Sequence, residues 1–565
     1  MIFPDSRKTK LLGGISLCLF SGILGRAAFP KPDFSFAAYF ALVPVLLLFL
    51  RLIRPREGFL YGLCFGFTFY YSSIFWLNTL VPYNPYIPIG IFLLGAYLGL
   101  YGGFFGWATV LLKNRSPRLL FILIPSVWAL LEYARNVGQL AFPWSYLSAT
   151  QSKNTLMIQI CDITGIWGVS FLIMMINVSL ALLADAVLSR KILPVKPKEG
   201  KDKSALHAPL PYLPSVIVSF FLLCIVLVYG AVRRGKDFEG EKEVRVAVLQ
   251  PDIPQKTKYA SYAGTEAERE RLCSLLESVS FEMLGELKDP TVDLVVLPES
   301  AFTRPMFNYQ KEALAKLGGE AKRLSAGILI GANREVFYNK AGEIAGPGEE
   351  IAEYDAYNSC WYVLPSGSLS PETYDKIQLV PFGEHLPYFD LIPGFQRIIV
   401  QTGSFLKGKN YTLFPVQAVD RNGKKTSELH FATVICFESS FNWLFRRFAK
   451  RGADFFIIVT NDGWYEDSAG PYQHFDLAVF RAIETRRWIV RCSNRGVSCL
   501  ISPKGEILQE TNLNTRAVIV SSFYPAQNHT CHELTGDLFI YLLLLLLIGE
   551  SLFHYQRRGK KKKSS

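Results

Sequence analysis

The stretch Phe431-Ala-Thr-Val-Ile-Cys-Phe-Glu-Ser-Ser440 is an apolar run that reaches Cys436 and then turns polar. A nearly continuous apolar run of this kind predicts a strand buried on both faces of its sheet. We expect a helix to follow directly, so that the cysteine stands at a strand end with its thiol directed into a cleft. The stretch therefore predicts an α/β fold with Cys436 as a candidate nucleophile.

Two charged residues precede this cysteine in similar settings. Glu299 ends the strand-like run Leu294-Val-Val-Leu-Pro-Glu299, and Lys376 lies in the stretch that begins Tyr374-Asp-Lys376. A cationic neighbour and a helix N-terminus both favour the thiolate form of a cysteine. We expect Glu299 to act as the general base, and Lys376 with the backbone N–H of Phe437 to stabilise an oxyanion. Either charged residue alone would more commonly be a solvated surface charge, so the interpretation depends on all three occurring together.

Residues 244–525 alternate strand-like runs with amphipathic helices, which predicts a layered α/β domain. A stripe of Leu272, Leu275, Leu276, Val279 and Met283 at helical spacing marks the buried face of one helix. The expected strands are 244–249, 293–298, 326–331, 358–364, 430–435, 455–460, 489–501 with a break at Asn494-Arg-Gly496, and 518–523, with a further helix near 471–487.

Outside this domain the chain of 565 residues is strongly apolar. A bilayer crossing needs about 20 apolar helical residues. The candidate membrane spans number eight: 11–29, 37–53, 58–80, 86–112, 119–134, 162–187, 212–232 and 537–555. The 119–134 segment is the shortest and contains Glu132, with Arg135 directly beyond it, and both residues are functional candidates because charge is costly at membrane depth. The predicted domains are a membrane domain at 1–235 with seven spans, an α/β domain at 240–525, a C-terminal span at 537–556 and a basic tail at 557–565.

The net charge of +12 is placed as in a membrane protein, and not as in a nucleic-acid-binding protein. If all eight segments cross, most short-loop basic residues fall on one side, which the positive-inside rule assigns to the cytoplasm. Both termini are then cytoplasmic and residues 233–536 lie outside. The opposite short loops hold only Arg26, Lys31, Arg135 and Lys153, and Arg233, Arg234 and Lys236 flank the seventh span on the outer side. The basic residues that set the orientation are Arg7, Lys8, Lys10, Arg51, Arg54, Arg56, Lys113, Arg115, Arg118, Arg190, Lys191, Lys196, Lys198, Lys201, Lys203, Arg557, Arg558 and Lys560 to Lys563.

The ten cysteines form no CxxC pair and no His/Cys cluster, so we predict neither a metal site nor a cofactor.

Together these motifs resemble the apolipoprotein N-acyltransferase family, which belongs to the nitrilase (carbon–nitrogen hydrolase) superfamily. The resemblance spans nearly the whole chain. Its segments are Val248-Leu-Gln250, Ile253-Pro-Gln255, Leu297-Pro-Glu-Ser300, Tyr374-Asp-Lys376, Leu379-Val-Pro-Phe-Gly-Glu384, Ile435-Cys-Phe-Glu438, Thr460-Asn-Asp-Gly-Trp464, Gln473-His474, Arg481-Ala-Ile-Glu484, Asn494-Arg-Gly496, Trp128, Glu132, Arg135, Phe142-Pro-Trp144 and 165–170.

The resemblance implies an α-β-β-α sandwich carrying a Glu299, Lys376 and Cys436 triad, with Glu384 and Glu438 as supporting acids. It implies a two-step reaction in which Cys436 takes an acyl chain from a phospholipid as a thioester. The acyl chain then passes to the α-amine of a diacylglyceryl-cysteine at an apolipoprotein N-terminus. The implied setting is the bacterial inner membrane, with the α/β domain in the periplasm.

The chain departs from the family pattern at several positions. Phe437 stands where tyrosine is usual, Tyr259 where tryptophan is usual, and Trp464-Tyr-Glu466 replaces the common Trp-Phe-Gly. Tyr259, Trp144 and Trp464 are the substrate-binding candidates. We expect His474 to make a structural hydrogen bond.

Two other interpretations remain open at this stage. The same triad with water as second nucleophile would make a membrane-tethered amidase or nitrilase-type hydrolase, although eight spans are excessive for a tether. A non-enzymatic scaffold or transporter is the third class, and the intact triad argues against it.

Overall fold

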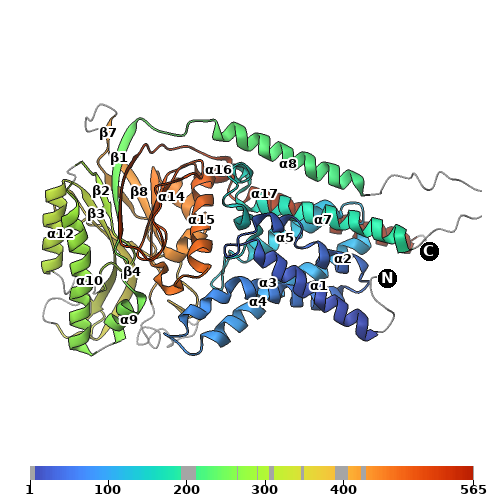
Figure 1. Cartoon of the computed structure of the whole chain (residues 1–565), viewed down its shortest axis with the longest axis horizontal. Helices are drawn as coiled ribbons and strands as arrows, with labels where there is room; N and C mark the ends of the chain where they lie inside the picture. Colours follow the sequence, from blue (N-terminus) through green and yellow to red (C-terminus); the bar gives the residue numbers. More distant parts are fainter. Residues whose placement is uncertain are drawn as a thin grey trace, which may run out of the picture. The chain divides into compact units, whose positions relative to one another are not determined.

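The computed structural model describes residues 7–192, 212–263, 265–288, 291–303, 311–344, 349–388, 405–420 and 428–563. Two compact units divide the chain (Figure 1). The helical unit comprises 1–136, 143–235 and 537–565, and the sandwich unit comprises 137–142 and 236–536.

The helical unit contains all eight of the apolar segments predicted from the sequence, and each of them is helical. Within the described residues, six helices are long and apolar enough to cross a membrane, whereas 35–51 and 120–134 are shorter. The eight-span count therefore stays a prediction. The elements are α1 (Arg7–Ala27), η1 (Ser35–Tyr39), α2 (Val43–Arg51), α3 (Pro55–Ile74), η2 (Phe75–Leu80), α4 (Ile87–Arg115), α5 (Leu120–Ala134), η3 (Leu147–Gln151), η4 (Met157–Ile160), α6 (Cys161–Thr164), α7 (Ile166–Ile192), α8 (Leu213–Arg234) and α17 (Leu538–Lys563).

Helices α3 and α4 pack backbone against backbone along a row of glycines. A Cβ atom added at Gly62 would lie 2.3 Å from the carbonyl oxygen of Gly102, which no side chain could tolerate. Small residues at four-residue spacing allow helices to approach this closely in a membrane. The glycines thus fix which helices of this unit are neighbours.

Arg233, an exception to the charge asymmetry, is neutralised locally. Its Nη2 lies 2.7 Å from Oδ2 of Asp162, and the Tyr229 hydroxyl donates to Oδ1 of the same carboxylate at 2.7 Å. The ion pair thus supplies the counter-charge of the buried Asp162 carboxylate.

The sandwich unit consists of two mixed sheets with helices on their outer faces (Figure 1). The first sheet has the order β13-β1-β2-β3-β4-β5, with β7 paired to β1, and the second has the order β12-β11-β10-β9-β8-β6. In Figure 1, α10 and α12 lie on the side of the first sheet, and α14 and α15 lie on the side of the second.

The strands of the first sheet are β1 (Lys242–Gln250), β2 (Leu294–Val296), β3 (Gly327–Tyr338), β4 (Glu353–Val363), β5 (Tyr374–Asp375), β7 (Val419–Asp420) and β13 (Ala517–Phe523). Those of the second are β6 (Leu413–Val416), β8 (Leu429–Ile435), β9 (Phe455–Thr460), β10 (Ile489–Ser493), β11 (Cys499–Ile501) and β12 (Ile507–Leu508). The helices are α9 (Gln255–Ala263), α10 (Glu266–Glu286), α12 (Lys311–Leu324), α14 (Asn442–Ala449), α15 (Gly470–Thr485) and α16 (Cys531–Thr535).

The two sheets share one core. The Tyr362 ring on β4 lies 5.5 Å from the Phe431 ring on β8, and the Cys492 thiol on β10 donates to the carbonyl of Val296 on β2 at 3.4 Å. Strands β1, β2 and β3 are parallel, as are β8, β9 and β10, so the carboxyl ends of each set meet at one edge of its sheet. The two edges meet, since the N–H of Asn461, which follows β9, donates to the carboxylate of Glu299, which follows β2, at 3.0 Å.

The predicted strands and helices are confirmed, with differences at their ends. β3 and β4 extend well beyond the predicted ranges because they pair over eleven residues on each strand. The predicted stripe of α10 is wrong at Leu275, which is 53% exposed. Two other residues of that stripe, Leu276 and Met283, are buried as predicted.

Candidate active site

The nucleophile candidate occupies a sharp bend at the end of β8. Cys436 has a φ of 53°, in the left-handed region, and is buried. Residues with a side chain are held in that region only by their surroundings. The helix expected to follow directly is instead a 3₁₀ turn, η7 (Cys436–Ser440), and α14 begins only at Asn442.

Glu438 fastens this turn to the segment that carries the lysine. Its Oε2 accepts from the main-chain N–H of Ile435 and from the Tyr374 hydroxyl, each at 2.8 Å. Its Oε1 accepts from the N–H groups of Ile377 and Gln378 at 2.7 and 2.9 Å. Burial raises the pKa of Glu438 to about 7, although these donors oppose the shift. Glu438 is thus a positioning residue that joins the bend at Cys436 to Lys376.

Glu299 follows β2 and is held at both carboxylate oxygens. The Asn358 side chain donates to Oε1 at 2.9 Å, and the main-chain N–H of Asn461 donates to Oε2 at 3.0 Å. Its backbone lies so close to β3 that a Cβ atom at Gly331 would be 2.6 Å from the Cα of Glu299. A glycine at position 331 is what allows the acid to reach the strand edge.

Lys376 lies between two carboxylates. Its Nζ donates to Oε1 of Glu384 at 2.9 Å and lies 3.7 Å from Oε1 of Glu299. Burial alone would lower the pKa of Lys376, but Glu384, Glu299 and Cys436 outweigh it and raise the pKa above its ordinary value. Lys376 is therefore a permanent cation in this site.

The Cys436 thiol lies within electrostatic reach of both triad partners. Burial raises the pKa of the thiol well above its ordinary value, and the charge of Glu299 adds to the increase. Lys376 and a hydrogen bond with the Thr460 side chain act in the opposite direction. The resting thiol is therefore protonated, so the geometry calls for a base beside it. The structure thus brings the three predicted residues together.

The aromatic candidates are dispersed. Tyr259 on α9 is 39% exposed, and Trp464 in η8 (Asp462–Tyr465) is half-buried. Trp144 belongs to the helical unit, where it is buried with its ring 5.6 Å from that of Trp76. Phe142, which belongs to the sandwich unit, places its ring 6.3 Å from that of Phe437.

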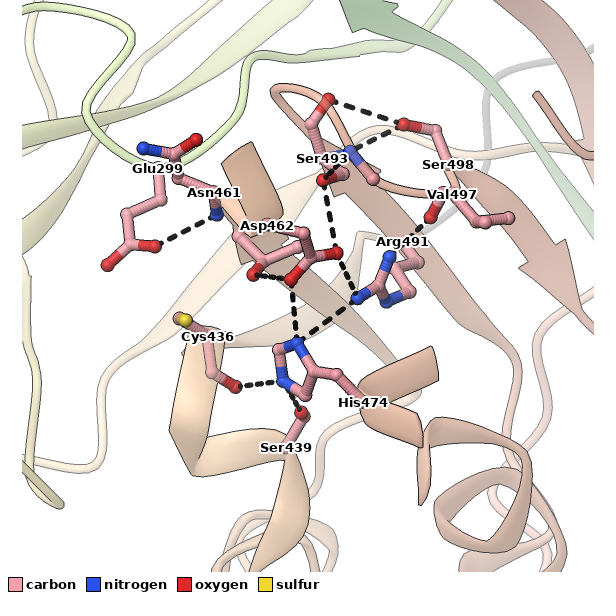
Figure 2. Close-up of polar contacts among 12 residues, drawn as sticks. Glu299, Cys436, Ser439, Asn461, Asp462, His474, Arg491, Ser493, Val497 and Ser498 are labelled. Atoms are coloured by element: carbon pink, nitrogen blue, oxygen red, sulfur yellow. Dashed lines mark hydrogen bonds and ion pairs between the residues drawn. The ribbon is translucent and has the colours of Figure 1, made fainter. Parts of the chain in front are cut away.

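Two buried titratable residues beside the site were not predicted as site residues. Lys258 donates from Nζ to the carbonyls of Glu299 at 3.2 Å and Ser300 at 2.9 Å. His474 contacts the carbonyl of Cys436 at 3.0 Å (Figure 2). The position of Lys258, five residues after Ile253-Pro, gave no signal, because a lysine on a polar helix looks solvated. Across the described parts of the chain, no cluster of three or more His, Cys, Asp and Glu is placed to hold a metal.

The chain is similar to known proteins over most of its length. Residues 245–526 match the carbon–nitrogen hydrolase family, and residues 21–179 match the apolipoprotein N-acyltransferase N-terminal domain. Apolipoprotein N-acyltransferase of Geobacter metallireducens is 30% identical over 93% of this chain and 92% of its own. Apolipoprotein N-acyltransferase 1 of Treponema denticola is 27% identical over 91% and 90%. Among solved structures, Nit3 of Saccharomyces cerevisiae, a nitrilase-superfamily member, covers 51% of this chain and 93% of its own at 17% identity, with a TM-score of 0.34.

The sandwich unit is thus a carbon–nitrogen hydrolase domain. The match to the relatives extends through the helical unit as well. The chain belongs to the apolipoprotein N-acyltransferase family. It is a membrane protein and an acyltransferase that acts in lipoprotein N-acylation.

Proposed function

We propose that this protein moves an acyl chain from a phospholipid to the N-terminal amine of a diacylglyceryl-cysteine, through a thioester on Cys436. The observation that carries the proposal is a shared cation. Lys376 lies 2.9 Å from Glu384 and 3.7 Å from Glu299, beside a buried thiol. One lysine cannot neutralise two carboxylates, so the site retains an acid that is able to accept a proton.

In the first step Glu299 takes the proton of the Cys436 thiol as the sulfur attacks the sn-1 ester carbonyl. The oxygen that becomes negative is stabilised by the Lys376 ammonium and by the main-chain N–H of Phe437. When the tetrahedral intermediate collapses, the ester C–O bond breaks. The proton passes to the leaving alkoxide, which departs as a lysophospholipid.

In the second step the lipoprotein amine attacks the thioester carbonyl. Glu299 accepts a proton from the amine, the C–S bond breaks, and Cys436 regains its proton. Amines attack thioesters far more readily than they attack esters, so a thioester intermediate suits an amine acceptor. Glu384 holds Lys376 in place during both steps, and Glu438 holds the turn that carries Phe437.

The partners in this proposal are a phospholipid acyl donor, a diacylated apolipoprotein acceptor and the surrounding membrane lipids. Tyr259, Trp464 and Trp144 are proposed to contact these lipid chains. We place the protein in the bacterial inner membrane, with 240–525 in the periplasm and both termini in the cytoplasm. The segments at 1–235 and 537–556 lie in the membrane in this proposal, and 557–565 is a basic cytoplasmic tail.

The test uses purified protein and phospholipid with a labelled sn-1 chain, in the absence of lipoprotein. We expect label on Cys436 that hydroxylamine removes and that a diacylated lipopeptide discharges as an amide. Cys436→Ala should abolish labelling, whereas Cys531→Ala, at the exposed cysteine of the same unit, should leave it intact.

Release of free fatty acid with no persistent adduct would instead favour the membrane-tethered hydrolase. Wild-type transfer by the Cys436→Ala variant would overturn the proposed nucleophile.

A further inference from the structure

We propose that His474 is a positioning residue for the nucleophile, which it holds through the main-chain carbonyl of Cys436, and that Asp462 and Arg491 fix it in that role. The inference rests on the proposed function of Cys436. It adds to the triad a second group of buried residues, which lie behind the cysteine.

The contacts form a continuous chain of polar groups (Figure 2). His474 Nε2 lies 3.0 Å from the carbonyl oxygen of Cys436 and 2.8 Å from the Ser439 hydroxyl. His474 Nδ1 lies 2.8 Å from Oδ1 of Asp462. Arg491 donates from Nη2 to Oδ2 of Asp462 at 2.8 Å. His474, Asp462 and Arg491 are almost fully buried, so solvent does not compete for these bonds.

The partners of the imidazole fix its orientation. Nδ1 lies beside a carboxylate, which only accepts, so Nδ1 donates to Asp462. Nε2 lies against both the Cys436 carbonyl and the Ser439 hydroxyl. Arg491 lies 3.4 Å from Nδ1 and holds the other oxygen of the Asp462 carboxylate.

The contact of His474 with the Cys436 carbonyl matters because the backbone of Cys436 is in the left-handed region, with a φ of 53°. A backbone in that region returns to an ordinary conformation unless its surroundings hold it. Glu438 accepts from the N–H of Ile435, the residue before Cys436, and His474 contacts the carbonyl of Cys436 itself. The two contacts hold the backbone before and after the bend, and hence the direction of the thiol.

The same network positions the base. Asp462 directly follows Asn461, whose N–H donates to Oε2 of Glu299 at 3.0 Å. Asp462 is held by Thr460 at 3.1 Å as well as by Arg491, and a Cβ atom at Gly496 would lie 2.0 Å from its Oδ2. A displacement of Asp462 would therefore move both the nucleophile and its base.

The network also acts on the thiol through the charge of Asp462. The Asp462 carboxylate raises the pKa of Cys436, as Glu299 does, whereas Lys376 lowers it. The Tyr465 phenol is the other titratable group coupled to Cys436. His474 and Arg491 both contact Asp462. Loss of the His474 contact removes one partner of that carboxylate, so the Cys436 thiol should become harder to deprotonate.

The test compares His474→Ala and His474→Gln in the full-length protein. The glutamine amide can donate to the Cys436 carbonyl but lacks the Nδ1 donor to Asp462. We expect the alanine variant to lower the single-turnover rate of Cys436 acylation about 100-fold, with little change in the phospholipid KM. We expect the glutamine variant to recover about tenfold of that loss. In both variants the pH midpoint for alkylation of Cys436 by iodoacetamide should rise by about one unit.

Glu533→Gln is the matched control, because Glu533 forms a buried ion pair with Arg487 at 2.6 Å in the same unit and away from the site. It should lower the thermal midpoint and leave the alkylation midpoint unchanged. If the alanine variant does not fold, the glutamine variant alone decides. Wild-type acylation rates and an unmoved alkylation midpoint in His474→Gln would overturn the inference. Transfer that survives Cys436→Ala would overturn the proposed function instead.

Discussion

Two clusters of buried charge, one in each unit, differ in how their charges are balanced. In the sandwich unit Lys376 serves both Glu299 and Glu384, and a thiol lies beside them. In the helical unit Glu132 faces one cation, Arg135, with Nη2 at 3.9 Å from Oε1.

The groups that surround the two clusters differ as well. Glu132 accepts from the Trp128 ring N–H at 2.9 Å and the Leu147 N–H at 2.8 Å, and Arg135 donates to the Trp144 carbonyl at 2.6 Å. A balanced pair tied to backbone groups holds the segment between α5 and η3 in place. In the sandwich unit two carboxylates share Lys376 beside the Cys436 thiol, so one carboxylate remains available to accept a proton. Burial of charge is therefore common to the two clusters, and the ratio of acids to cations is what distinguishes them.

The largest expected effect comes from Glu299→Gln, which removes the base and leaves a residue of the same size. General-base catalysis contributes about 10²–10⁴-fold, so we expect a loss of that order in the rate of Cys436 acylation. Single-turnover labelling by phospholipid measures it.

Glu384→Gln is the companion variant, because it removes the other carboxylate on Lys376 and leaves the base. We expect a loss of about tenfold, since one positioning hydrogen bond to a charged group is worth about 1.5–3 kcal/mol and part is retained by the amide oxygen. Equal losses in the two variants would contradict the assignment of Glu299 as the base.

The next effect is on the stability of the protein and concerns the buried ion pair of Glu132 and Arg135. Removing one partner of a buried pair costs about 3–5 kcal/mol, because it leaves the other charge uncompensated. We expect Glu132→Gln and Arg135→Met each to destabilise the protein by that amount, and the double variant to cost less than their sum. Thermal unfolding in detergent measures all three.

Asp185→Asn is the control for this cycle, since Asp185 pairs with Arg51 at 2.9 Å but is only partly buried. Its effect should be well below that of Glu132→Gln. Additive losses in the double variant would mean that Glu132 and Arg135 act independently and that the balance argument fails.

The sequence predicted the parts of this molecule in which a local pattern has one physical explanation. Continuous apolar runs became β8 and β9, and the polar break at Asn494-Arg-Gly496 separates β10 from β11. Glu299 and Lys376 follow β2 and β5, which run in the same direction in one sheet, whereas Cys436 follows β8 in the other sheet. The approach of Lys376 to Glu299 follows from that topology.

What the sequence could not predict depends on contacts between distant segments. Nothing local distinguishes Asp462 from a turn residue, and only the fold brings it between His474 and Arg491. Likewise Leu275 fits the periodicity of α10, but it points outward because the face of the helix is set by the sheet it covers. The turn at Cys436 was predicted as a helix start because the pattern does not reveal a positive φ.

The last expected effect concerns Lys258, the second buried amine near Glu299, and it is a slope of stability against pH. Burial lowers the pKa of Lys258 to about 7, against the opposing pull of Glu299. Between that value and the unfolded pKa of about 10.4, the unfolded chain binds a proton that the folded protein has released. Stability should therefore rise with pH through this window, by up to about 1.4 kcal/mol per unit, and Lys258→Met should flatten the rise.

Lys256→Met, at an exposed lysine of the same helix, should keep the wild-type slope. Unfolding measured at several pH values between 7 and 10 separates the two variants. The result bears on the charge balance of the site, since a neutral Lys258 leaves Lys376 as the cation shared by Glu299 and Glu384. If stability rises with pH by the same slope in the wild type and in Lys258→Met, Lys258 stays charged in the folded protein. Two lysines would then balance two carboxylates. The contrast with the pair of Glu132 and Arg135 would disappear.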